Sequence, residues 1–324
     1  MSVSFGYQLL GSSEAFGRTK RQIEKVTKAG AAVLVEGETG TGKEMVARAI
    51  HYMGSRHEKP FVPVNCGALA EHLVESELFG HERGAFTDAK SASLGLVHEA
   101  GGGTLFLDEI DALGAKAQAA LLRFLQDGVY RRVGGSSMRQ ADLRVVVASN
   151  ANLKALSNER HFRKDLYYRV SVLVIHVPPL RERGNDVVEL ANVFLARLAR
   201  QSGCDNARLN RSSIAFMLQY DWPGNVRELE NAVQRAFLLR ESDEIDLAAA
   251  VLGEQAQMNA ESRTEFKQAK NKAVADFERL YLGELLSATN GNMTRAAVLA
   301  GQDRSAFGRL VRKHGLRPPR VDNT

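Results

Sequence analysis

The glycine-rich segment 37–44, with the sequence Gly-Glu-Thr-Gly-Thr-Gly-Lys-Glu, limits the possible folds more than any other part of the chain. Residues 31–36 before it form a short apolar run with β-branched side chains, which is typical of a buried strand. Residues 45–50 after it have the pattern of a helix. A strand, a glycine loop and a helix in this order predict a phosphate-binding loop, because glycines let several backbone N–H groups point toward one anion.

Each residue of this loop is a candidate for binding phosphate: Gly37, Glu38, Thr39, Gly40, Thr41, Gly42, Lys43 and Glu44. Lys43 is expected to reach the outer phosphates, and the helix behind it contributes the positive end of its dipole. Glu44 stands where such loops usually have a Ser or Thr that touches magnesium, so contact with the metal is expected from another residue. The alternative is a turn that merely joins a strand to a helix. The matched positions of Gly37, Gly42 and Lys43 argue against it.

Two adjacent carboxylates, Asp108 and Glu109, follow the apolar residues 105–107 at the end of a predicted strand. In an enzyme with a phosphate loop, Asp108 is expected to hold magnesium and Glu109 to orient or deprotonate the attacking water. A strand that exits into a loop is also often acidic, so the pair takes its meaning from the glycine loop upstream. Asn65 ends another predicted strand, at 60–65, and faces the same edge if the sheet is parallel.

A further strand is predicted at 143–148 and is followed by Ser149 and Asn150. These polar residues either sense the outer phosphate or cap the next turn, and the pattern alone leaves both open. Residues 80–94 have no helical or strand period and are predicted as a loop around Phe86. The local pattern favours an aromatic ring tucked under this loop over one offered to a partner.

Composition excludes several classes of protein. The 324 residues are 44% hydrophobic, which suits an ordinary folded core. No apolar run approaches the roughly 18 residues that a membrane-spanning helix needs, and the first residues lack a signal-peptide pattern. Only two cysteines occur, Cys66 and Cys204. A disulfide framework or a zinc site is therefore not expected. Location in a reducing cytoplasm is expected instead.

Positive charge is concentrated toward the C-terminal end. Residues 290–320 contain seven basic side chains and one acidic one, whereas the net charge of the whole chain is +5. Helical patterns at 294–300 and 304–314, separated by a turn with Gly301, predict a helix-turn-helix. The expected DNA-binding residues are Arg295, Arg304, Ser305, Arg309, Arg312 and Lys313. A solvated basic tail is the alternative.

Two further helices are predicted: one at 11–30, with Ser12 or Ser13 as its cap and Gly30 as its stop, and an amphipathic one at 115–127.

The patterns divide the chain into four regions. Residues 1–180 are predicted as an α/β nucleotide-binding domain and 181–252 as a helical lid. Residues 253–275 are predicted as a linker and 276–324 as the DNA-binding domain. Arg227, at the start of a helix in the lid, is expected to face the nucleotide. The single tryptophan, Trp222, lies in the same region and is expected to pack in its core.

Five motifs carry a resemblance to a known family. They are Gly37 to Glu44, Gly84-Ala-Phe-Thr-Asp-Ala89, Gly102-Gly-Thr-Leu-Phe-Leu-Asp-Glu109, Phe162-Arg-Lys-Asp-Leu-Tyr-Tyr-Arg169 and Trp222-Pro-Gly-Asn-Val-Arg-Glu-Leu229. Over roughly residues 10–318 the chain resembles sigma-54-dependent transcriptional activators, which are bacterial enhancer-binding proteins of the AAA+ ATPase class. The resemblance implies an α/β fold: an AAA+ P-loop core with a parallel sheet, a helical lid subdomain, and a C-terminal all-α Fis-like helix-turn-helix domain.

The resemblance also implies roles for single residues. Asp108 and Glu109 would be the metal and water carboxylates, and Asn65 would pair with Glu109. Arg163 and Arg169 would be arginine fingers that reach the ATP of a neighbouring subunit. Arg227 would be the sensor arginine of the lid. The residues that would touch sigma-54 are Gly84, Ala85, Phe86, Thr87, Asp88 and Ala89.

Cofactors and partners follow from the same resemblance. ATP and Mg²⁺ would be the cofactors, and copies of the chain would assemble, from dimer to hexamer, into a ring. The expected partners are the sigma-54 RNA polymerase holoenzyme and double-stranded enhancer DNA, with no membrane. Asp88 stands where the commonest form of the loop motif has a glycine, which adds a charge at its tip. The regulatory domain common in the family has no counterpart here, so a regulator acting in trans is expected.

The resulting prediction is an ATP-hydrolysing transcriptional activator that binds upstream DNA and remodels sigma-54 RNA polymerase to open promoters. One alternative is a DNA-binding regulator that uses the AAA+ fold only as a nucleotide-sensing scaffold, independent of sigma-54. This alternative predicts that the catalytic carboxylates or the arginine fingers are replaced by other residues. The sequence retains all four of them: Asp108, Glu109, Arg163 and Arg169. A second alternative is an unfoldase for protein substrates, for which a helix-turn-helix has no use.

Overall fold

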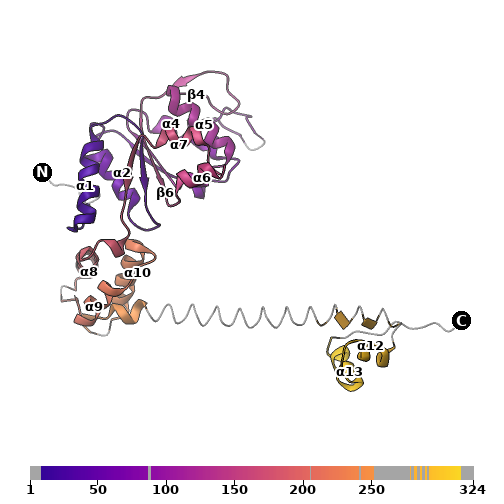
Figure 1. Cartoon of the computed structure of the whole chain (residues 1–324). Coiled ribbons are helices and arrows are strands. Elements are labelled where there is room, and N and C mark those ends of the chain that lie inside the picture. Colours follow the sequence, from indigo (N-terminus) through magenta and orange to yellow (C-terminus); the bar gives the residue numbers. More distant parts are fainter. Residues whose placement is uncertain are drawn as a thin grey trace. The chain divides into compact units, whose positions relative to one another are not determined.

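Helices cover both faces of a parallel sheet in the larger part of the computed structural model (Figure 1). The structure describes residues 9–86, 89–204, 206–240, 242–251, 278, 281–282, 285–286, 289 and 292–314. By its internal contacts the chain divides into two units, residues 1–250 and 251–324.

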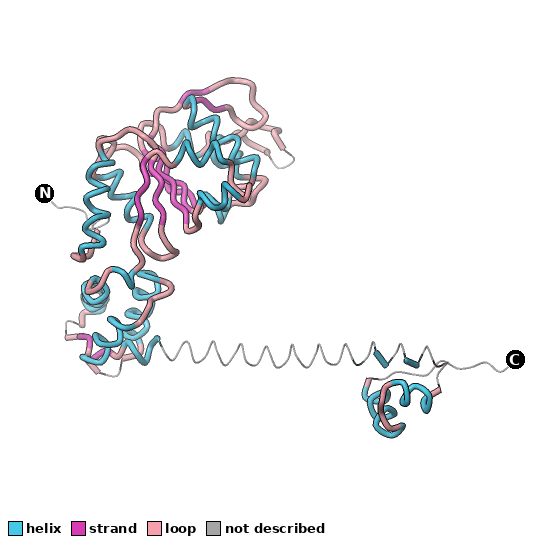
Figure 2. The backbone as a smooth tube through the Cα atoms, in the orientation of Figure 1, coloured by secondary structure: helices cyan, strands magenta, loops and turns pink. Residues whose placement is uncertain are grey.

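The sheet of the first unit contains, within the described residues, five strands in the order β2-β3-β6-β1-β7, all parallel. Its strands are drawn in magenta in Figure 2, with helices on both sides. The strands are β1 Val33–Glu36, β2 Phe61–Asn65, β3 Thr104–Asp108, β6 Arg144–Ser149 and β7 Leu173–His176. The central strands are almost wholly apolar, as expected of parallel strands covered on both faces. Because the strands are parallel, their carboxyl ends meet at one edge, and the loops that follow β1, β3 and β6 lie together there.

Helices α1 (Glu14–Thr27) and α2 (Lys43–Tyr52) cover one face of the sheet. The first helix was predicted at 11–30, with Ser12 or Ser13 as its cap and Gly30 as its stop; the cap at Ser13 is confirmed, but the helix ends earlier, at Thr27. Ser13 caps the helix at its start, because its Oγ accepts a hydrogen bond from Phe16 N at 3.3 Å. At the other end the buried guanidinium of Arg144 donates to the carbonyls of Val26 and Thr27, which satisfies the last turn before Gly30 is reached.

The other face carries helices α3 Val74–Phe79, α4 Leu96–Glu99, α5 Ala115–Asp127, α6 Leu153–Asn158 and α7 Lys164–Val170. The bounds of α5 agree with its predicted range, 115–127. A short antiparallel hairpin follows it, formed by β4 Val129–Tyr130 and β5 Arg139–Gln140. Three short 3-10 turns connect other elements: η2 Cys66–Ala68, η3 Ile110–Ala112 and η4 Leu180–Glu182.

A helical subdomain follows β7. It consists of α8 Asp186–Ser202, α9 Arg211–Gln219 and α10 Asn225–Leu238, with β8 Arg208–Leu209 paired to β9 Glu244–Ile245. Trp222 lies in its core, 1% exposed, and donates from Nε1 to Met217 O at 3.0 Å. The expected packing role of the single tryptophan is therefore confirmed.

The second unit contains α12 (Met293–Leu299) and α13 (Arg304–Lys313), joined by a short turn with Gly301. Asn292 caps α12 and Asp303 caps α13, each through a side-chain oxygen that accepts backbone N–H groups. The buried residues that hold this unit together are Leu282, Leu286, Ala296, Ala297, Phe307 and Val311. The predicted linker, 253–275, lies outside the described residues.

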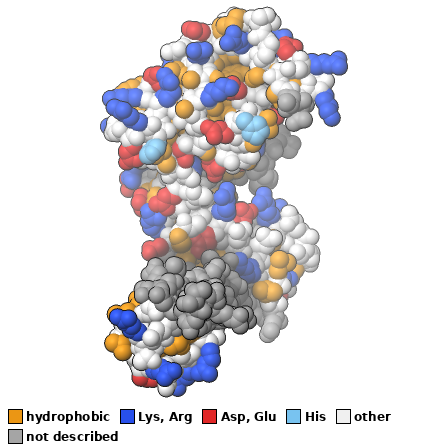
Figure 3. Space-filling model, turned by 90° about the vertical axis from the view of Figure 1, so that its right-hand side faces the viewer, with side chains coloured by type: hydrophobic (Ala, Val, Ile, Leu, Met, Phe, Trp, Pro, Cys, Tyr) orange, Lys and Arg blue, Asp and Glu red, His pale blue; other side chains and the backbone are white. Residues whose placement is uncertain are grey.

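Acidic and basic side chains intermingle with scattered apolar ones over much of the visible face of the molecule (Figure 3). In the part of the chain that the structure describes, each helix is too short or too polar to cross a membrane.

Candidate active site

The phosphate loop connects β1 to α2, as predicted, and Gly42 caps the helix. Gly40 has a φ of +78°, and a Cβ built on it would lie 2.3 Å from Gly224 O. Only glycine fits a position with that backbone and so close a neighbour. The loop is therefore packed directly beneath the first residues of α10.

Lys43 lies over the loop and is 8% exposed. Its Nζ donates to Gly37 O at 2.8 Å and to Glu38 O at 3.0 Å. Burial lowers the pKa of Lys43, while the nearby carboxylates of Asp108, Asp111 and Glu109 act in the opposite direction. The ammonium group is thus held between loop carbonyls and a group of carboxylates. Glu44 points elsewhere, because its carboxylate pairs with Arg48 at 2.7 Å on the surface of α2.

Asp108 ends β3, and Glu109 follows it with a left-handed backbone, φ 54°. Few residues other than glycine adopt this conformation, and it is frequent at functional sites. Asp108 Oδ1 accepts a hydrogen bond from Glu109 N at 3.0 Å. A Cβ built on Gly67 would lie 2.4 Å from Glu109 Oε2, so the Glu109 carboxylate lies against the backbone that follows β2.

Asn65 ends β2 in register with Asp108, so it lies at the predicted edge of the sheet. Its Oδ1 accepts a hydrogen bond from Ala68 N at 3.1 Å and thereby caps η2. Within the described residues it makes no hydrogen bond with Glu109, and their pairing stays a prediction.

The end of β6 also reaches the site. Asn150 Nδ2 donates to Thr39 Oγ1 at 3.2 Å, which brings one predicted residue against the loop. Ser149, fully buried, donates to Asp111 Oδ1 at 2.6 Å. Asp111 lies in η3, two residues after Glu109, and was not predicted as a site residue. The adjacent acids 108 and 109 were its only signal.

The helical subdomain contacts the loop through the start of α10. Val226 N and Arg227 N donate to Gly40 O at 3.0 and 3.3 Å. The positive charge of Arg227 is close enough to lower the pKa of Lys43. Arg227 therefore begins beside the phosphate loop, and its contact with a nucleotide stays a prediction.

The side chain of Glu38 turns toward the helical subdomain. Its carboxylate accepts from Arg181 Nη2 and Nη1 at 2.5 and 2.8 Å and from Asn225 Nδ2 at 3.1 Å. Hydrogen bonds from Arg181 and then Asn225 lower the pKa of Glu38 to about 2. Arg181 and Asn225 were not predicted as site residues. They are 143 and 187 residues from Glu38, and only the motif 222–229 pointed to Asn225.

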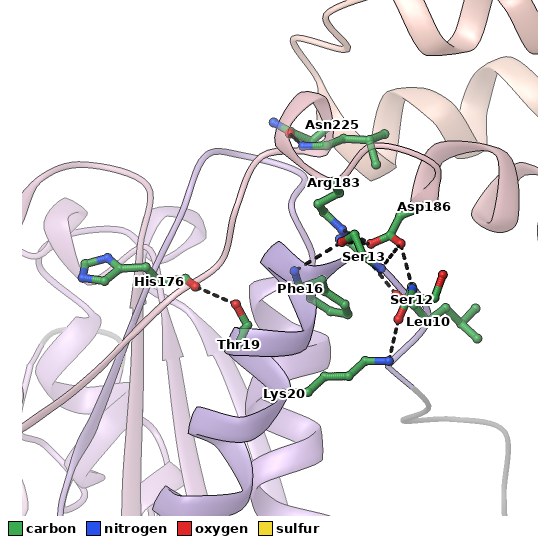
Figure 4. A network of polar contacts seen from close by, with 12 residues as sticks. Leu10, Ser12, Ser13, Phe16, Thr19, Lys20, His176, Arg183, Asp186 and Asn225 are labelled. Carbon is green, nitrogen blue, oxygen red and sulfur yellow. Dashed lines mark hydrogen bonds and ion pairs between the residues drawn. The ribbon is translucent and has the colours of Figure 1, made fainter.

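A buried network anchors the start of α8 to the residues before α1 (Figure 4). The fully buried carboxylate of Asp186 accepts hydrogen bonds from Ser12 N and Ser13 N, both at 2.7 Å. Ser13 Oγ donates to the same carboxylate at 2.8 Å and Arg183 Nε at 3.0 Å. Arg183 also donates to Leu10 O at 2.8 Å. Residues 10–13 are therefore tied to the segment that joins the two subdomains.

The two predicted arginine fingers lie on and just before α7. Arg163 is exposed, and its guanidinium pairs with Asp165 at 2.8 Å. Its backbone N–H donates to the buried side chain of Gln118 at 2.8 Å, which fixes the turn. Arg169 donates to Leu125 O at 2.9 and 2.6 Å, at the carboxyl end of α5. Neither contacts the phosphate loop of its own chain in the described structure, as a role in trans requires.

The predicted sigma-54 loop is described at Gly84, Ala85, Phe86 and Ala89, whereas Thr87 and Asp88 lie outside the described residues. Phe86 is partly buried, and its ring lies edge-on to His81 with centroids 5.0 Å apart. This agrees with the ring tucked against its loop that the local pattern favoured. Contact with sigma-54 stays a prediction.

The predicted DNA-binding side chains Arg295, Arg304, Ser305, Arg309, Arg312 and Lys313 are exposed. Lys313 pairs with Glu278 Oε2 at 3.0 Å, and His314 lies 2.6 Å from the same oxygen. Arg312 donates to Gly308 O at 3.2 Å, one turn earlier in α13. The structure thus leaves these basic groups at the surface of the second unit.

Comparison with known proteins identifies the family. Residues 9–176 match the model of the sigma-54 interaction domain, and residues 181–269 match that of the AAA+ ATPase lid domain. The nitrogen fixation protein VnfA of Azotobacter vinelandii is 40% identical over 315 residues, 95% of this chain and 59% of VnfA. The response regulator protein PilR of Pseudomonas aeruginosa is 42% identical over 312 residues, 95% of this chain and 70% of PilR.

A solved structure agrees with this result. The crystal structure of NtrX from Brucella abortus in complex with ATP has a TM-score of 0.70 and 33% identity, and the match covers 95% of this chain and 69% of NtrX. The chain spans less than two thirds of VnfA and of the related AnfA, 59% and 57%. The expected AAA+ core with its parallel sheet and helical lid is confirmed. The chain belongs to the AAA+ ATPases with a sigma-54 interaction domain, the family that its five motifs resemble.

Proposed function

We propose that this chain binds ATP with Mg²⁺ at the carboxyl edge of its sheet, hydrolyses it, and uses the hydrolysis to remodel sigma-54 RNA polymerase at promoters. The observation that carries the proposal is the meeting of the phosphate loop, Lys43 and the Asp108–Glu109 pair at one sheet edge. Membership of the sigma-54 interaction family supplies the partner. The complex of NtrX with ATP supports the choice of nucleotide.

Lys43 and the loop backbone would bind the phosphates. The two carbonyls that hold Lys43 Nζ, of Gly37 and Glu38, are neutral acceptors, and a phosphate oxygen is a stronger partner for an ammonium group. Glu109 would orient the attacking water and accept its proton, a role typically worth about 10²- to 10⁴-fold in rate. Its fixed left-handed backbone supports this role, because the carboxylate is positioned before the substrate arrives.

Asp108 is the residue that would hold Mg²⁺. Only one of its oxygens is engaged, by Glu109 N, in the contacts described. The described residues contain no cluster of three or more metal-ligating side chains. Magnesium that arrives with a nucleotide needs only one or two carboxylates, since phosphates and waters complete its octahedron. The donor set therefore fits Mg²⁺, which would neutralise charge on the phosphates.

Copies of the chain would assemble into a ring, with Arg163 and Arg169 each facing the nucleotide of a neighbour. The exposure of Arg163 and its separation from its own loop support this arrangement. An arginine supplied in trans stabilises the charge that develops on the transferred phosphoryl group. The loop 84–89 would transmit the nucleotide state to sigma-54.

The region 276–324 would bind double-stranded enhancer DNA as a Fis-like helix-turn-helix, with 1–180 and 181–252 as the AAA+ subdomains and 253–275 as the linker. The exposed basic residues of α13 support this reading, because basic side chains around a recognition helix contact phosphates. Cytoplasmic location and a regulator acting in trans belong to the same proposal.

Replacement of Glu109 by Gln tests the enzymatic part. ATP hydrolysis by E109Q should fall at least about 100-fold, because the amide neither accepts a proton nor carries charge. ATP affinity, measured by calorimetry, should stay within about threefold, since Glu109 does not line the phosphate loop. E14Q serves as the matched control, because Glu14 lies outside the phosphate loop and pairs with Arg18 in an exposed contact at 3.1 Å, and its rate should be unchanged.

Equal rates for wild type and E109Q would favour the alternative, in which the fold only senses nucleotide. Omission of magnesium, or its removal by a chelator, should abolish hydrolysis by the wild type. Hydrolysis that persists without a divalent cation would contradict the assigned role of Asp108.

A further inference from the structure

We propose that Glu38 is a positioning residue. Its side chain, engaged by Arg181 and Asn225, fixes the helical lid against the phosphate loop and thereby places Arg227 over the nucleotide. This inference rests on the proposed function, because it assigns a task to residues around the same site. It differs from the expected role of Glu38, which as a member of the glycine loop was predicted only to bind phosphate.

The contact between Glu38 and Arg181 has a specific geometry. Nη1 and Nη2 of Arg181 donate to the two carboxylate oxygens of Glu38, at 2.8 and 2.5 Å. A bidentate pair fixes orientation as well as distance, which a single contact does not. Arg181 lies in η4, the turn that leads from β7 to α8. The pair therefore connects the phosphate loop to the hinge of the lid.

Asn225 makes the second connection. It is fully buried, and its Nδ2 donates to Glu38 Oε2 and to Thr39 O, both at 3.1 Å. Its Oδ1 accepts from Leu180 N at 2.8 Å, next to Arg181. One amide side chain thus joins the loop, the hinge and the first residue of α10. Its backbone is left-handed, with φ 53°, a conformation that Asn tolerates better than most residues.

The third connection is made by backbone groups. Gly40 O accepts from Val226 N and Arg227 N. Amides in the first turn of a helix have no acceptor within the helix, so these two can bind the loop. The Cβ of Arg227 would lie 3.1 Å from a Cβ built on Gly40. The side chain of Arg227 therefore leaves the helix directly above the loop. Any rotation of the lid that breaks the Glu38 contacts also moves Arg227.

An ordinary surface ion pair is the simpler explanation of the Glu38–Arg181 contact. Their side chains are 42% and 39% exposed, and exposed pairs alone contribute little. Two features argue for more. All three connections converge on the consecutive residues 38, 39 and 40, and each comes from the hinge or the start of α10. The carboxylate also stays ionised over the whole neutral range, because Arg181 and Asn225 lower the pKa of Glu38 to about 2.

A double-mutant cycle on the full chain tests the coupling between Arg181 and Arg227. ATP hydrolysis is measured for wild type, R181Q, R227Q and the double variant. Each single variant should lower kcat/KM by about three- to tenfold, the range for partly exposed charge contacts. The kcat/KM of the double variant should be no more than about twofold below that of the less active single variant, because Arg227 cannot act once the lid is displaced. Independent, multiplicative losses would overturn the proposal.

Further variants separate positioning from general stability. E38Q should behave like R181Q, and the exchanged pair E38R/R181E should recover part of the lost activity. R208Q and E244Q break an exposed ion pair of 2.9 Å elsewhere in the lid, and their activity should match the wild type. If E38R/R181E is no more active than E38Q, or if the control variants lose as much activity as E38Q, a specific role for Glu38 is contradicted.

Hydrogen exchange provides a readout that does not depend on hydrolysis. The amides of Val226 and Arg227 donate to Gly40 O, so their exchange should be at least about threefold faster in R181Q than in wild type and unchanged in E244Q. Unchanged exchange in R181Q would overturn the proposal. If the wild type hydrolyses no ATP, the proposed function is wrong, and this measurement still decides whether Glu38 holds the lid.

Discussion

Asp186 is the residue on which the joint between the two subdomains depends most. It is fully buried, and it accepts hydrogen bonds from Ser12, Ser13 and Arg183 (Figure 4). Burial by itself raises the pKa of Asp186, but the hydrogen bonds from Ser13 and Arg183 outweigh it and hold the pKa below its usual 3.8. A carboxylate satisfied in this way stabilises the fold only while it is ionised.

Replacement of Asp186 by Asn should lower the free energy of unfolding by about 3 kcal/mol at pH 7, because Arg183 loses its buried counter-charge. The folded-state pKa is depressed, so this stabilisation is fully present above the unfolded pKa of about 3.8 and disappears as pH falls through the lower folded value. The difference between wild type and D186N should therefore shrink below about pH 4. Urea unfolding followed by the fluorescence of Trp222, the only tryptophan, measures it.

Asp142 offers a matched control for this prediction. It also pairs with an arginine, Arg56, at 2.6 Å, but its side chain is 84% exposed. D142N should change the free energy of unfolding by less than about 0.5 kcal/mol, as expected for an exposed ion pair. A D186N variant as stable as D142N would show that the buried network does not hold the hinge.

At the scale of elements, the hairpin β4–β5 and the predicted sigma-54 loop pack against each other. Glu82 pairs with Arg132 at 3.0 Å, and Glu82 N donates to Val133 O at 3.0 Å. A Cβ built on Gly134 would lie 2.8 Å from the Cβ of Ala85. The hairpin therefore sets the position of the residues that lead into Phe86.

Gly134→Ala should weaken sigma-54 binding by about threefold or more while ATP hydrolysis stays within about twofold. The added methyl displaces Ala85 and strains a backbone with φ +76°, which typically costs about 1 kcal/mol. Fluorescence anisotropy with labelled sigma-54 measures the binding. Gly203→Ala is the control, because its φ is +64° but no atom lies within 4 Å of the added carbon. Equal effects of both substitutions would mean that strain, not contact with the loop, is responsible.

Elements were easier to predict from the sequence than the contacts between them. Periodicity gave α5 its correct bounds, and the glycine pattern placed the loop between β1 and α2. The end of α1 was missed because a residue far along the chain, Arg144, satisfies its last carbonyls. Local pattern carries no information about such a partner.

The same limit applies to the site. Residues at strand ends, such as Asp108, Asn65 and Asn150, were predictable, since parallel strands bring their carboxyl ends together. Asp111 and Arg181 were not, because their partners depend on how η3 and η4 turn. Their roles appear only when distant segments are folded against each other.

At the scale of the whole molecule, the proposed active site would be completed by a neighbouring chain, which would supply the arginine fingers. Arg163 is exposed and paired only with Asp165 through its guanidinium in the described contacts, whereas Arg169 also caps the carbonyls at the end of α5. Loss of Arg163 should therefore affect hydrolysis and leave the fold intact. Loss of Arg169 should affect both, because carbonyls at the end of α5 lose a charged donor. Arg163 is thus the cleaner probe of an arginine supplied in trans.

Mixing two inactive variants tests this arrangement. The R163Q variant keeps the catalytic carboxylates but lacks the arginine finger, and the E109Q variant keeps the finger but lacks the general base. Each variant alone should therefore hydrolyse ATP at least about 100-fold more slowly than the wild type. In a mixed ring, an E109Q subunit next to an R163Q subunit completes one working pocket. An equimolar mixture should recover roughly a quarter of the wild-type rate, since about one junction in four then combines an intact Glu109 with an intact Arg163. The recovered rate per chain should fall on dilution, because the junctions dissociate. A mixture no more active than its components, at concentrations where the wild type is active, would place Arg163 outside the neighbouring pocket.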